Sequence, residues 1–221
     1  MQTGKNPEPR KSYRKTDNFN YQLGEYTNLP KPQLNLNPLF FEVINKRKSE
    51  RVFTKLTLEM LGSLLWHSAK AKRVFIAETG NILSHRASAS AGAIHPIDIL
   101  ISLPVTMKSR LLYYYNPFLH KLASLSVNRV ELDNFFKNIN NCLSIENGLL
   151  IWFVADYSRT AVKYKNSESL IWRDAGALIM TVQLVATALN INSCAVGTLG
   201  EPFLSKCFDN KLFSAGGLLL G

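Results

Sequence analysis

Cysteine is scarce in this 221-residue sequence, which contains only Cys142, Cys194 and Cys207. An odd number of cysteines at wide spacings fits neither a disulfide framework nor a zinc site built on paired cysteines. We therefore expect reduced, mostly buried thiols and no bound metal.

Long apolar runs are also missing. Stretches such as residues 149–155 fall far short of the roughly 18 residues that cross a bilayer, and the first residues are basic and polar, without an apolar segment. These features predict a cytoplasmic protein that does not associate with a membrane.

The glycine-rich motifs of common nucleotide-binding folds do not occur. The sequence has no G-x-G-x-x-G and no G-x-x-x-x-G-K-[ST]. A Rossmann dinucleotide fold and a P-loop are therefore not expected.

Acidic residues are few, since 16 Asp and Glu stand against 26 Lys and Arg, for a net charge of +10. A basic surface can bind nucleic acid, because bound lysine and arginine release counterions from phosphate. The basic residues cluster at 5–15, 46–51 and 70–73, but no helix-turn-helix, zinc finger or aromatic RNA-binding motif accompanies them. We expect a solvated basic surface and no nucleic-acid partner; a non-catalytic basic binding protein is the alternative from another class.

Proline and asparagine mark the first part of the chain. Residues 1–37 contain Pro7, Pro9, Pro30 and Pro32, which exclude a long helix there. We predict a basic arm at 1–37 and one domain at 38–221, where an apolar content of 46% over the chain suffices for a core.

Hydrophobic periodicity predicts helices and strands in mixed order within this domain. Thr57 is placed to cap one helix, and Asp174 is placed to cap another. The expected elements are helices at 39–44, 57–69, 130–142, 174–189 and 203–207, and strands at 97–103, 111–115, 149–155 and 216–221. Residues 97–115 read as an antiparallel hairpin, and no regular strand–helix alternation occurs, so an α+β fold is favoured.

The helix expected from Asp174 is apolar on nearly all sides. Such a helix has no polar face to turn toward water. We expect it to be covered by other elements or by a second subunit.

Arg47, Ser49 and Arg51 bring two guanidinium groups and a hydroxyl into five residues, with Lys48 between them. Alternate residues of an extended segment point the same way, so these side chains can converge on one anion, and a phosphate suits them. An exposed basic turn is the alternative.

Small residues fill the segment before the strand expected at 97–103. Ser88, Ser90 and Gly92 lie in a run of alanines that ends at His95. Small side chains let backbone N–H groups approach a flat ligand, and serine hydroxyls can bond its oxygens. A flexible serine loop is the alternative, and His95 is expected to be structural.

Lys163 and Tyr164 follow the strand expected at 149–155. An adjacent lysine and tyrosine after a strand end could supply an ammonium and a phenol to an active site. A surface lysine beside a packed tyrosine is the alternative.

Read in order, these segments resemble the nitroreductase-like flavoenzymes, and among them the SagB-type dehydrogenases, which include the azoline oxidases. The matching pieces are RKSERVF (47–53), RASASAGAIHP (86–96), LYYYNP (112–117), HKL (120–122), KY (163–164), DAG (174–176) and CAVG (194–197). Together they extend through residues 44–221.

The resemblance implies a three-layer α/β/α sandwich with an antiparallel-dominated central sheet, working as a homodimer with FMN at the subunit interface. It places Arg47, Lys48, Ser49 and Arg51 at the FMN phosphate and ribityl chain. Ser90 and Gly92 match the loop beside the flavin, and Gly197 matches the position whose backbone amide faces flavin N5.

The resemblance also implies an activity. Lys163 and Tyr164 match the pair that acts near the substrate in azoline oxidases, as base and orienting acid. The expected substrate is a thiazoline or oxazoline in a ribosomally made peptide, and a peptide cyclodehydratase complex is an expected partner. An NAD(P)H-dependent nitro- or quinone reductase acting on a small molecule is the alternative with the same cofactor.

Overall fold

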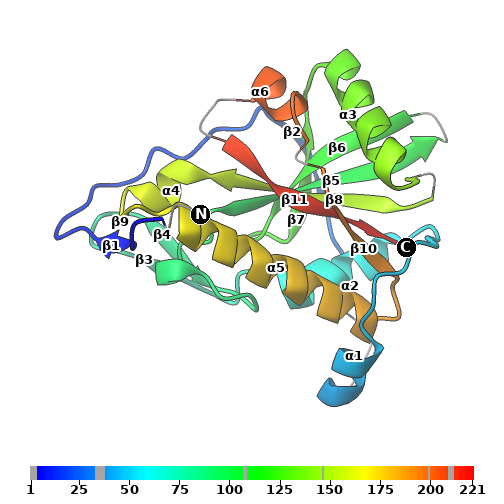
Figure 1. Ribbon diagram of the computed structural model, residues 1–221, viewed down its shortest axis with the longest axis horizontal. Helices are drawn as coiled ribbons and strands as arrows, with labels where there is room; N and C mark the ends of the chain where they lie inside the picture. The colour runs from blue at the N-terminus through cyan, green and yellow to red at the C-terminus, as the bar shows by residue number, and fades with distance from the viewer. Residues whose placement is uncertain (1–3, 33–37, 107–108, 146, 199, 209–211) are drawn as a thin grey trace.

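The computed structural model describes residues 4–32, 38–106, 109–145, 147–198, 200–208 and 212–221 (Figure 1). Its main element is a seven-stranded sheet in which each pair of neighbouring strands is antiparallel. Across the sheet the strands are β10 (Ser193–Val196), β11 (Leu212–Leu220), β8 (Leu149–Asp156), β5 (Ile97–Thr106), β6 (Ser109–Asn116), β7 (Lys121–Leu125) and β2 (Leu23–Asn28). The expected antiparallel sheet of an α+β fold is confirmed.

Helices cover both faces of this sheet. Successive side chains of a strand point to opposite faces, so Ile99 and Ile151 share a core with α2 (Leu58–Ser68) and α5 (Glu168–Ala188). Leu100 and Trp152 share the opposite core with α3 (Arg129–Cys142) and α6 (Phe203–Cys207). Figure 1 shows the same three layers, with α2 and α5 on one side and α3 and α6 on the other.

The local sequence signals for several elements are confirmed. All eight residues of β8 are buried, as an apolar run without alternation predicts for a central strand. Thr57 caps α2, because its side chain accepts a hydrogen bond from the backbone N–H of Met60 at 3.2 Å. The hairpin of β5 and β6 also forms as expected.

The remaining elements are short. α1 (Phe40–Lys46) has about two turns, α4 (Tyr157–Ala161) is little more than one turn, and Ala91–Ala93 forms a 3₁₀ turn. Two small antiparallel sheets lie beside the main one: β1 (Glu8–Pro9) pairs with β9 (Tyr164–Lys165), and β3 (Arg73–Ile76) pairs with β4 (Ile82–His85).

The prediction that Asp174 caps a helix is wrong. α5 begins at Glu168, so Asp174 lies inside the helix, in its second turn. Its carboxylate accepts hydrogen bonds from a separate loop, from Ser90 Oγ at 2.6 Å and from the backbone N–H of Ala91 at 3.0 Å. α5 begins with the polar residues Glu168 and Ser169, so the spacing of apolar residues does not reveal its first turn.

α5 is the one helix in the described ranges that is long and apolar enough to cross a membrane. In this structure it serves as a core helix, since Ile171, Ala175 and Val182 are buried in the core that it shares with the sheet. Trp172 and Met180 remain about half exposed, at 50% and 45%, so the covering of α5 expected from the sequence is incomplete in one chain.

The segment at 1–37, predicted to be an arm, contributes to the fold. Leu23–Asn28 pairs antiparallel with β7 as the edge strand β2, and Tyr21 and Leu29 on either side of it are buried. Before β2 the chain runs along the domain toward α4 and β9 (Figure 1). Residues 21–29 of this segment are therefore part of the domain.

Candidate functional site

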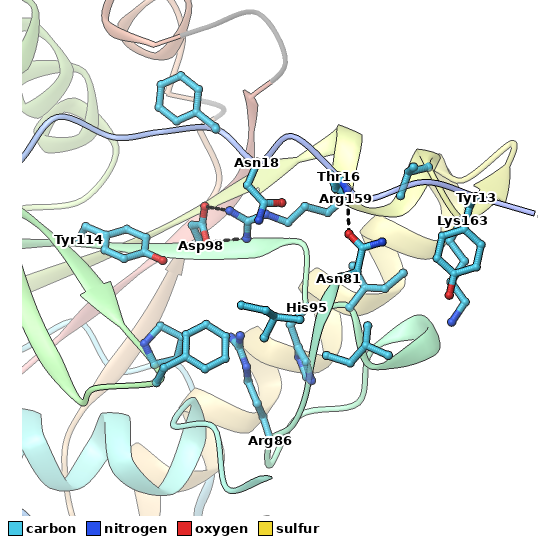
Figure 2. Close-up of a pocket in the computed structure, with 17 residues that line it drawn as sticks. Tyr13, Thr16, Asn18, Asn81, Arg86, His95, Asp98, Tyr114, Arg159 and Lys163 are labelled. Carbon is cyan, nitrogen blue, oxygen red and sulfur yellow. Dashed lines mark hydrogen bonds and ion pairs between the residues drawn. The ribbon is translucent and has the colours of Figure 1, made fainter. Parts of the chain in front are cut away.

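A cavity of about 210 Å³ lies between the N-terminal segment and the main domain (Figure 2). Its lining includes Tyr13 and Phe19 from that segment, Arg86 and His95 from the loop before β5, Arg159 from α4, and Lys163. We call it the Arg86 pocket. Most of its walls come from parts of the chain that are far apart in sequence.

The loop before β5 is held by a short chain of hydrogen bonds. Ser90 Oγ donates to Asp174 Oδ2 at 2.6 Å and accepts from the backbone N–H of His95 at 2.8 Å. Burial raises the pKa of Asp174 above its ordinary value, although the bonds from Ser90 and Ala91 favour its charged form. Ser90 therefore serves first to fix the loop, and one lone pair of its hydroxyl oxygen is left for a ligand.

Gly92 brings the loop against Lys163 and Tyr164. Its φ is 62°, in the left-handed region, and a Cβ added to it would lie 2.7 Å from Lys163 Nζ and 2.9 Å from Tyr164 Oη. Only glycine fits this approach without moving the two side chains. The structure thus joins three of the residues selected from the sequence.

The turn that carries Lys163 is held by the N-terminal segment. The backbone N–H of Arg10 donates to Lys163 O at 2.9 Å, and β1 pairs with β9 in the register Pro9 to Tyr164. Lys163 Nζ lies 5.7 Å from the centroids of both the Tyr13 and the Tyr164 rings, which is cation–π range. Sequence reasoning missed Tyr13, because no local pattern connects it with a turn 150 residues away.

Arg86 and His95 lie together on the inner wall. Arg86 Nε donates to Ser84 Oγ at 3.0 Å, and its guanidinium lies 5.6 Å from the centroid of the Phe118 ring. Burial, followed by the charge of Arg86, lowers the pKa of His95 to about 4, so the imidazole is neutral near pH 7 and donates from Nε2 to Ser84 O at 2.9 Å. His95 is structural, as expected. Arg86 lies within the matched segment 86–96, but the sequence alone did not indicate a function for it.

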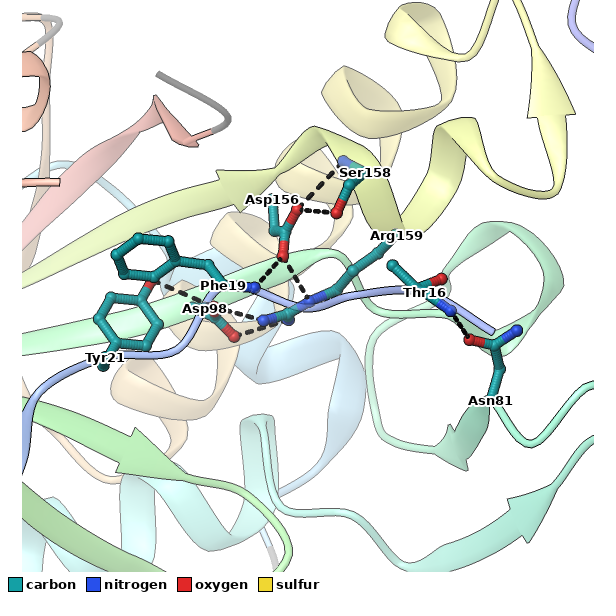
Figure 3. A network of polar contacts seen from close by, with 8 residues as sticks. All are labelled: Thr16, Phe19, Tyr21, Asn81, Asp98, Asp156, Ser158 and Arg159. Atoms are coloured by element: carbon teal, nitrogen blue, oxygen red, sulfur yellow. Dashed lines mark hydrogen bonds and ion pairs between the residues drawn. The ribbon is translucent and has the colours of Figure 1, made fainter. Parts of the chain in front are cut away.

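Arg159 lies between two carboxylates beside the pocket (Figure 3). Its Nη1 and Nη2 donate to the two oxygens of Asp98 at 2.8 and 2.7 Å, and its Nε lies 3.3 Å from Asp156 Oδ2. Burial alone would lower the pKa of Arg159, but the pairing with Asp98 outweighs it and raises the pKa above its ordinary value. This arrangement buries a charged cluster with its charges paired.

The same carboxylates fasten the N-terminal segment. The backbone N–H of Phe19 donates to Asp156 Oδ2 at 3.0 Å, and Tyr21 Oη donates to Asp98 Oδ2 at 3.1 Å. Further along, the backbone N–H of Thr16 donates to Asn81 Oδ1 at 2.8 Å, on the turn between β3 and β4 (Figure 3). These bonds hold residues 16–21 across the pocket.

The basic segment at 47–51 lies elsewhere. The backbone N–H of Glu50 donates to Ser193 O at 3.0 Å, just beyond the C-terminal end of α5, and Lys48 pairs with Glu50 at 2.6 Å. Asp174, which holds the Ser90 loop, is about 21 Å from that end of α5 at a rise of 1.5 Å per helical residue. One chain therefore does not bring Arg47, Ser49 and Arg51 together with Ser90 and Gly92.

Gly197 follows the edge strand β10 and is exposed. No atom lies within 4 Å of the position that a Cβ would take there. A ligand could therefore approach the backbone of Gly197 closely. The expected contact between its amide and flavin N5 stays a prediction.

A model of the nitroreductase family matches residues 44–209 of this chain. None of the curated proteins compared with the chain matches it. The match includes every residue selected from the sequence as a site residue.

Solved structures with the same fold are similar over most of the chain. A protein of Ralstonia eutropha JMP134 described as a nitroreductase is 19% identical over 95% of this chain and 97% of its own, with a TM-score of 0.66. The E. coli microcin synthetase McbBCD complex, solved with truncated pro-MccB17 bound, is 14% identical over 88% and 77%, with a TM-score of 0.58. A nitroreductase of Bacteroides fragilis NCTC 9343 with bound FMN is 13% identical over 84% and 88%, with a TM-score of 0.50. At these identities the likeness establishes the fold.

Replacing Gly92 by alanine tests the close approach of the loop to Lys163. The left-handed φ should cost about 1–2 kcal/mol of the free energy of unfolding, measured by urea titration. The ends of Lys163 and Tyr164 are flexible enough to move aside, so the variant should still fold. Asn138→Ala is the control, because Asn138 is exposed on α3 and the change should alter the free energy of unfolding by less than about 1 kcal/mol. Equal stability of wild type and Gly92→Ala would contradict the strained turn.

Replacing Arg159 by methionine tests the buried charge cluster. The change leaves the carboxylates of Asp98 and Asp156 buried without their cation, which should cost about 3–5 kcal/mol of the free energy of unfolding. The matched control is Lys206→Met, which breaks the more exposed pair with Glu131 and should cost less than about 1 kcal/mol. Similar losses in the two variants would show that the cluster is not what fastens this part of the fold.

Proposed function

This chain belongs to the nitroreductase family of oxidoreductases, and from that premise we propose that it is an FMN-dependent enzyme whose substrate reacts beside Gly92, Lys163 and Tyr164. The observation that supports the proposal is the close approach of Gly92 to Lys163 and Tyr164, with Lys163 also lining the Arg86 pocket. It supports the proposal because the loop expected to face the flavin and the two side chains expected to be catalytic lie next to each other in one chain.

The chemistry of the basic segment fits the phosphate of FMN. Within the described part of the chain, no carboxylate lies within ion-pair distance of Arg47 or Arg51, and Ser49 is exposed. Two guanidinium groups without acidic partners, next to a hydroxyl, are suited to charge-assisted bonds with a phosphate. Lys48 contributes less, because it already pairs with Glu50 at 2.6 Å.

A second copy of the chain would unite the two halves of the site. In one chain the Arg47 segment and the Gly92 loop lie toward opposite ends of α5, so a single FMN held by both requires two chains. Exposed apolar residues support this proposal: Phe40 and Phe41 on α1 are 63% and 77% exposed, and Trp172 and Met180 on α5 are about half exposed. We propose a homodimer that buries these residues and completes each FMN site from both chains.

The substrate proposed first is a thiazoline or oxazoline ring in a ribosomally made peptide. Oxidation to the azole removes a hydride from one ring carbon and a proton from a neighbouring atom. Bound FMN would supply the hydride acceptor. Lys163 would take the proton, and Tyr164 would orient the ring through its hydroxyl; both side chains are half-buried and meet at Gly92.

The likeness in fold to the McbBCD complex, which was solved with truncated pro-MccB17 bound, is a reason to test peptide substrates first. A peptide cyclodehydratase complex is the proposed partner, because such a complex would make the ring that this chain oxidises. The exposed basic residues near the N-terminus, such as Lys5 and Arg10, would be available for docking.

Replacing Arg47 by alanine tests the proposed phosphate contact. Removing one charge-assisted bond to phosphate should weaken FMN retention by about tenfold or more, measured from the flavin absorbance of the purified protein and by titration of FMN. Lys137→Ala is the control, because Lys137 is exposed on α3 and should leave retention unchanged. Measuring the mass in solution alongside separates loss of flavin from loss of the dimer. Wild-type flavin content in Arg47→Ala would remove this residue from the site, and a colourless wild type would remove the proposed cofactor.

Replacing Lys163 by alanine tests the proposed base. FMN should stay bound, and oxidation of a thiazoline-containing peptide should slow by about 10²–10⁴-fold, which is the usual effect of losing a general base. Lys165→Ala is the control, because Lys165 lies two residues away and is exposed. Unchanged turnover in Lys163→Ala would place the base elsewhere. Rapid NAD(P)H oxidation with nitro or quinone acceptors, without peptide oxidation, would favour the alternative reductase.

A further inference from the structure

We propose that the Arg86 pocket binds a carboxylate group of the substrate and that Arg86 is its anchor. The inference rests on the proposed function as far as the reacting end of the substrate is concerned. The assignment of Arg86 as the anchor rests on the geometry of the pocket. The ligand class is a molecule with an apolar or flat body and one carboxylate.

The guanidinium of Arg86 is only partly used by the protein. Its Nε donates to Ser84 Oγ at 3.0 Å, and within the described residues Nη1 and Nη2 have no hydrogen-bond partner. Figure 2 shows the side chain rising into the pocket, on the side of Asp98 and Tyr114. The two free nitrogens of the planar fork are suited to bind a carboxylate through two parallel hydrogen bonds.

The carboxylate of Asp98 does not neutralise Arg86 by direct contact. Both of its oxygens accept from Arg159, and one also accepts from Tyr21 Oη. Burial lowers the pKa of Arg86 to about 10, which leaves the group charged near pH 7 without a contacting anion. A buried cation of this kind is stabilised when an anionic ligand reaches it.

The other charges of the pocket also favour a single negative charge. Arg159 is already paired with two carboxylates, which leaves Arg86 as the cation that a ligand would meet. Asp98 would repel a dianion such as a phosphate monoester more strongly than a carboxylate. Phe118, Ile94 and Val162 supply apolar wall for the rest of the ligand.

The position of Arg86 connects this anchor with the reacting groups. Arg86 and Gly92 lie on one loop, and Lys163 both lines the pocket and meets Gly92. A molecule held at Arg86 by its carboxylate therefore extends along the pocket toward Lys163. Arg86 would act as a specificity-determining residue that selects acids over their neutral analogues.

The test measures binding of 3-phenylpropionate and of 3-phenylpropionamide, which share a shape and differ in charge, by calorimetry at low salt on the purified full chain. The wild type should bind the acid about tenfold or more tightly than the amide. Arg86→Gln should remove this preference, and Arg86→Lys should restore part of it. Arg73→Gln, a change of an exposed arginine on β3, should retain it.

Equal affinity of the wild type for acid and amide would overturn the proposal, and so would an undiminished preference in Arg86→Gln. If Arg86→Gln fails to fold, a lower preference for the acid in Arg86→Lys than in the wild type still assigns the effect to Arg86. Two peptides that differ only in a C-terminal carboxylate or amide distinguish the sources of the carboxylate: tighter binding of the peptide acid indicates a peptide terminus, and equal binding indicates a small free acid.

Failure of this inference and failure of the proposed function give different results. A yellow protein that binds acid and amide equally would retain the flavin and lose the anchor. A colourless protein that prefers the acid would support the anchor and contradict the proposed cofactor.

Discussion

The site depends on one buried cation that is paired with carboxylates from two strands. Arg159 on α4 pairs with Asp98 on β5 and Asp156 on β8, and those carboxylates also receive bonds from Phe19 and Tyr21. Neither carboxylate could stay buried without a cation, because an unpaired charge inside a protein costs several kcal/mol. The same pairing therefore joins the sheet, α4 and the N-terminal segment, and it fixes the roof of the Arg86 pocket.

The sequence predicts the parts of the fold that have a local cause. β8 shows as an apolar run, α3 as a stripe of buried residues at helical spacing, and α2 by its Thr57 cap. It fails where the cause is a distant contact. Asp174 resembles a cap because it precedes an apolar run, yet its partners, Ser90 and Ala91, are more than 80 residues earlier in the chain. β1 and β2 lie in a segment rich in proline and asparagine, and their pairing partners cannot be read from it.

The candidate site divides in the same way. The Lys163–Tyr164 pair and the Gly92 loop could be selected from residue type and motif, and the structure places them in contact. Tyr13 and Arg86 could not be assigned roles, because nothing near them in sequence indicates a cavity. The Arg47 segment lies toward the other end of α5, where Glu50 bonds to Ser193, and a single chain cannot close the distance.

The distance between the Arg47 segment and the Arg86 pocket affects which substitutions can change substrate specificity. The Arg86 pocket is built within one chain, from the N-terminal segment and the loop before β5. The proposed FMN site needs residues from two chains, and its phosphate donors are far from the pocket. A substitution in the N-terminal segment could therefore alter the pocket while leaving the phosphate donors of the cofactor in place. The exception is the loop from Arg86 to His95, because the proposed carboxylate anchor and the proposed flavin-facing glycine both lie on it. Under the proposed function, a change in that loop would affect both substrate choice and cofactor position.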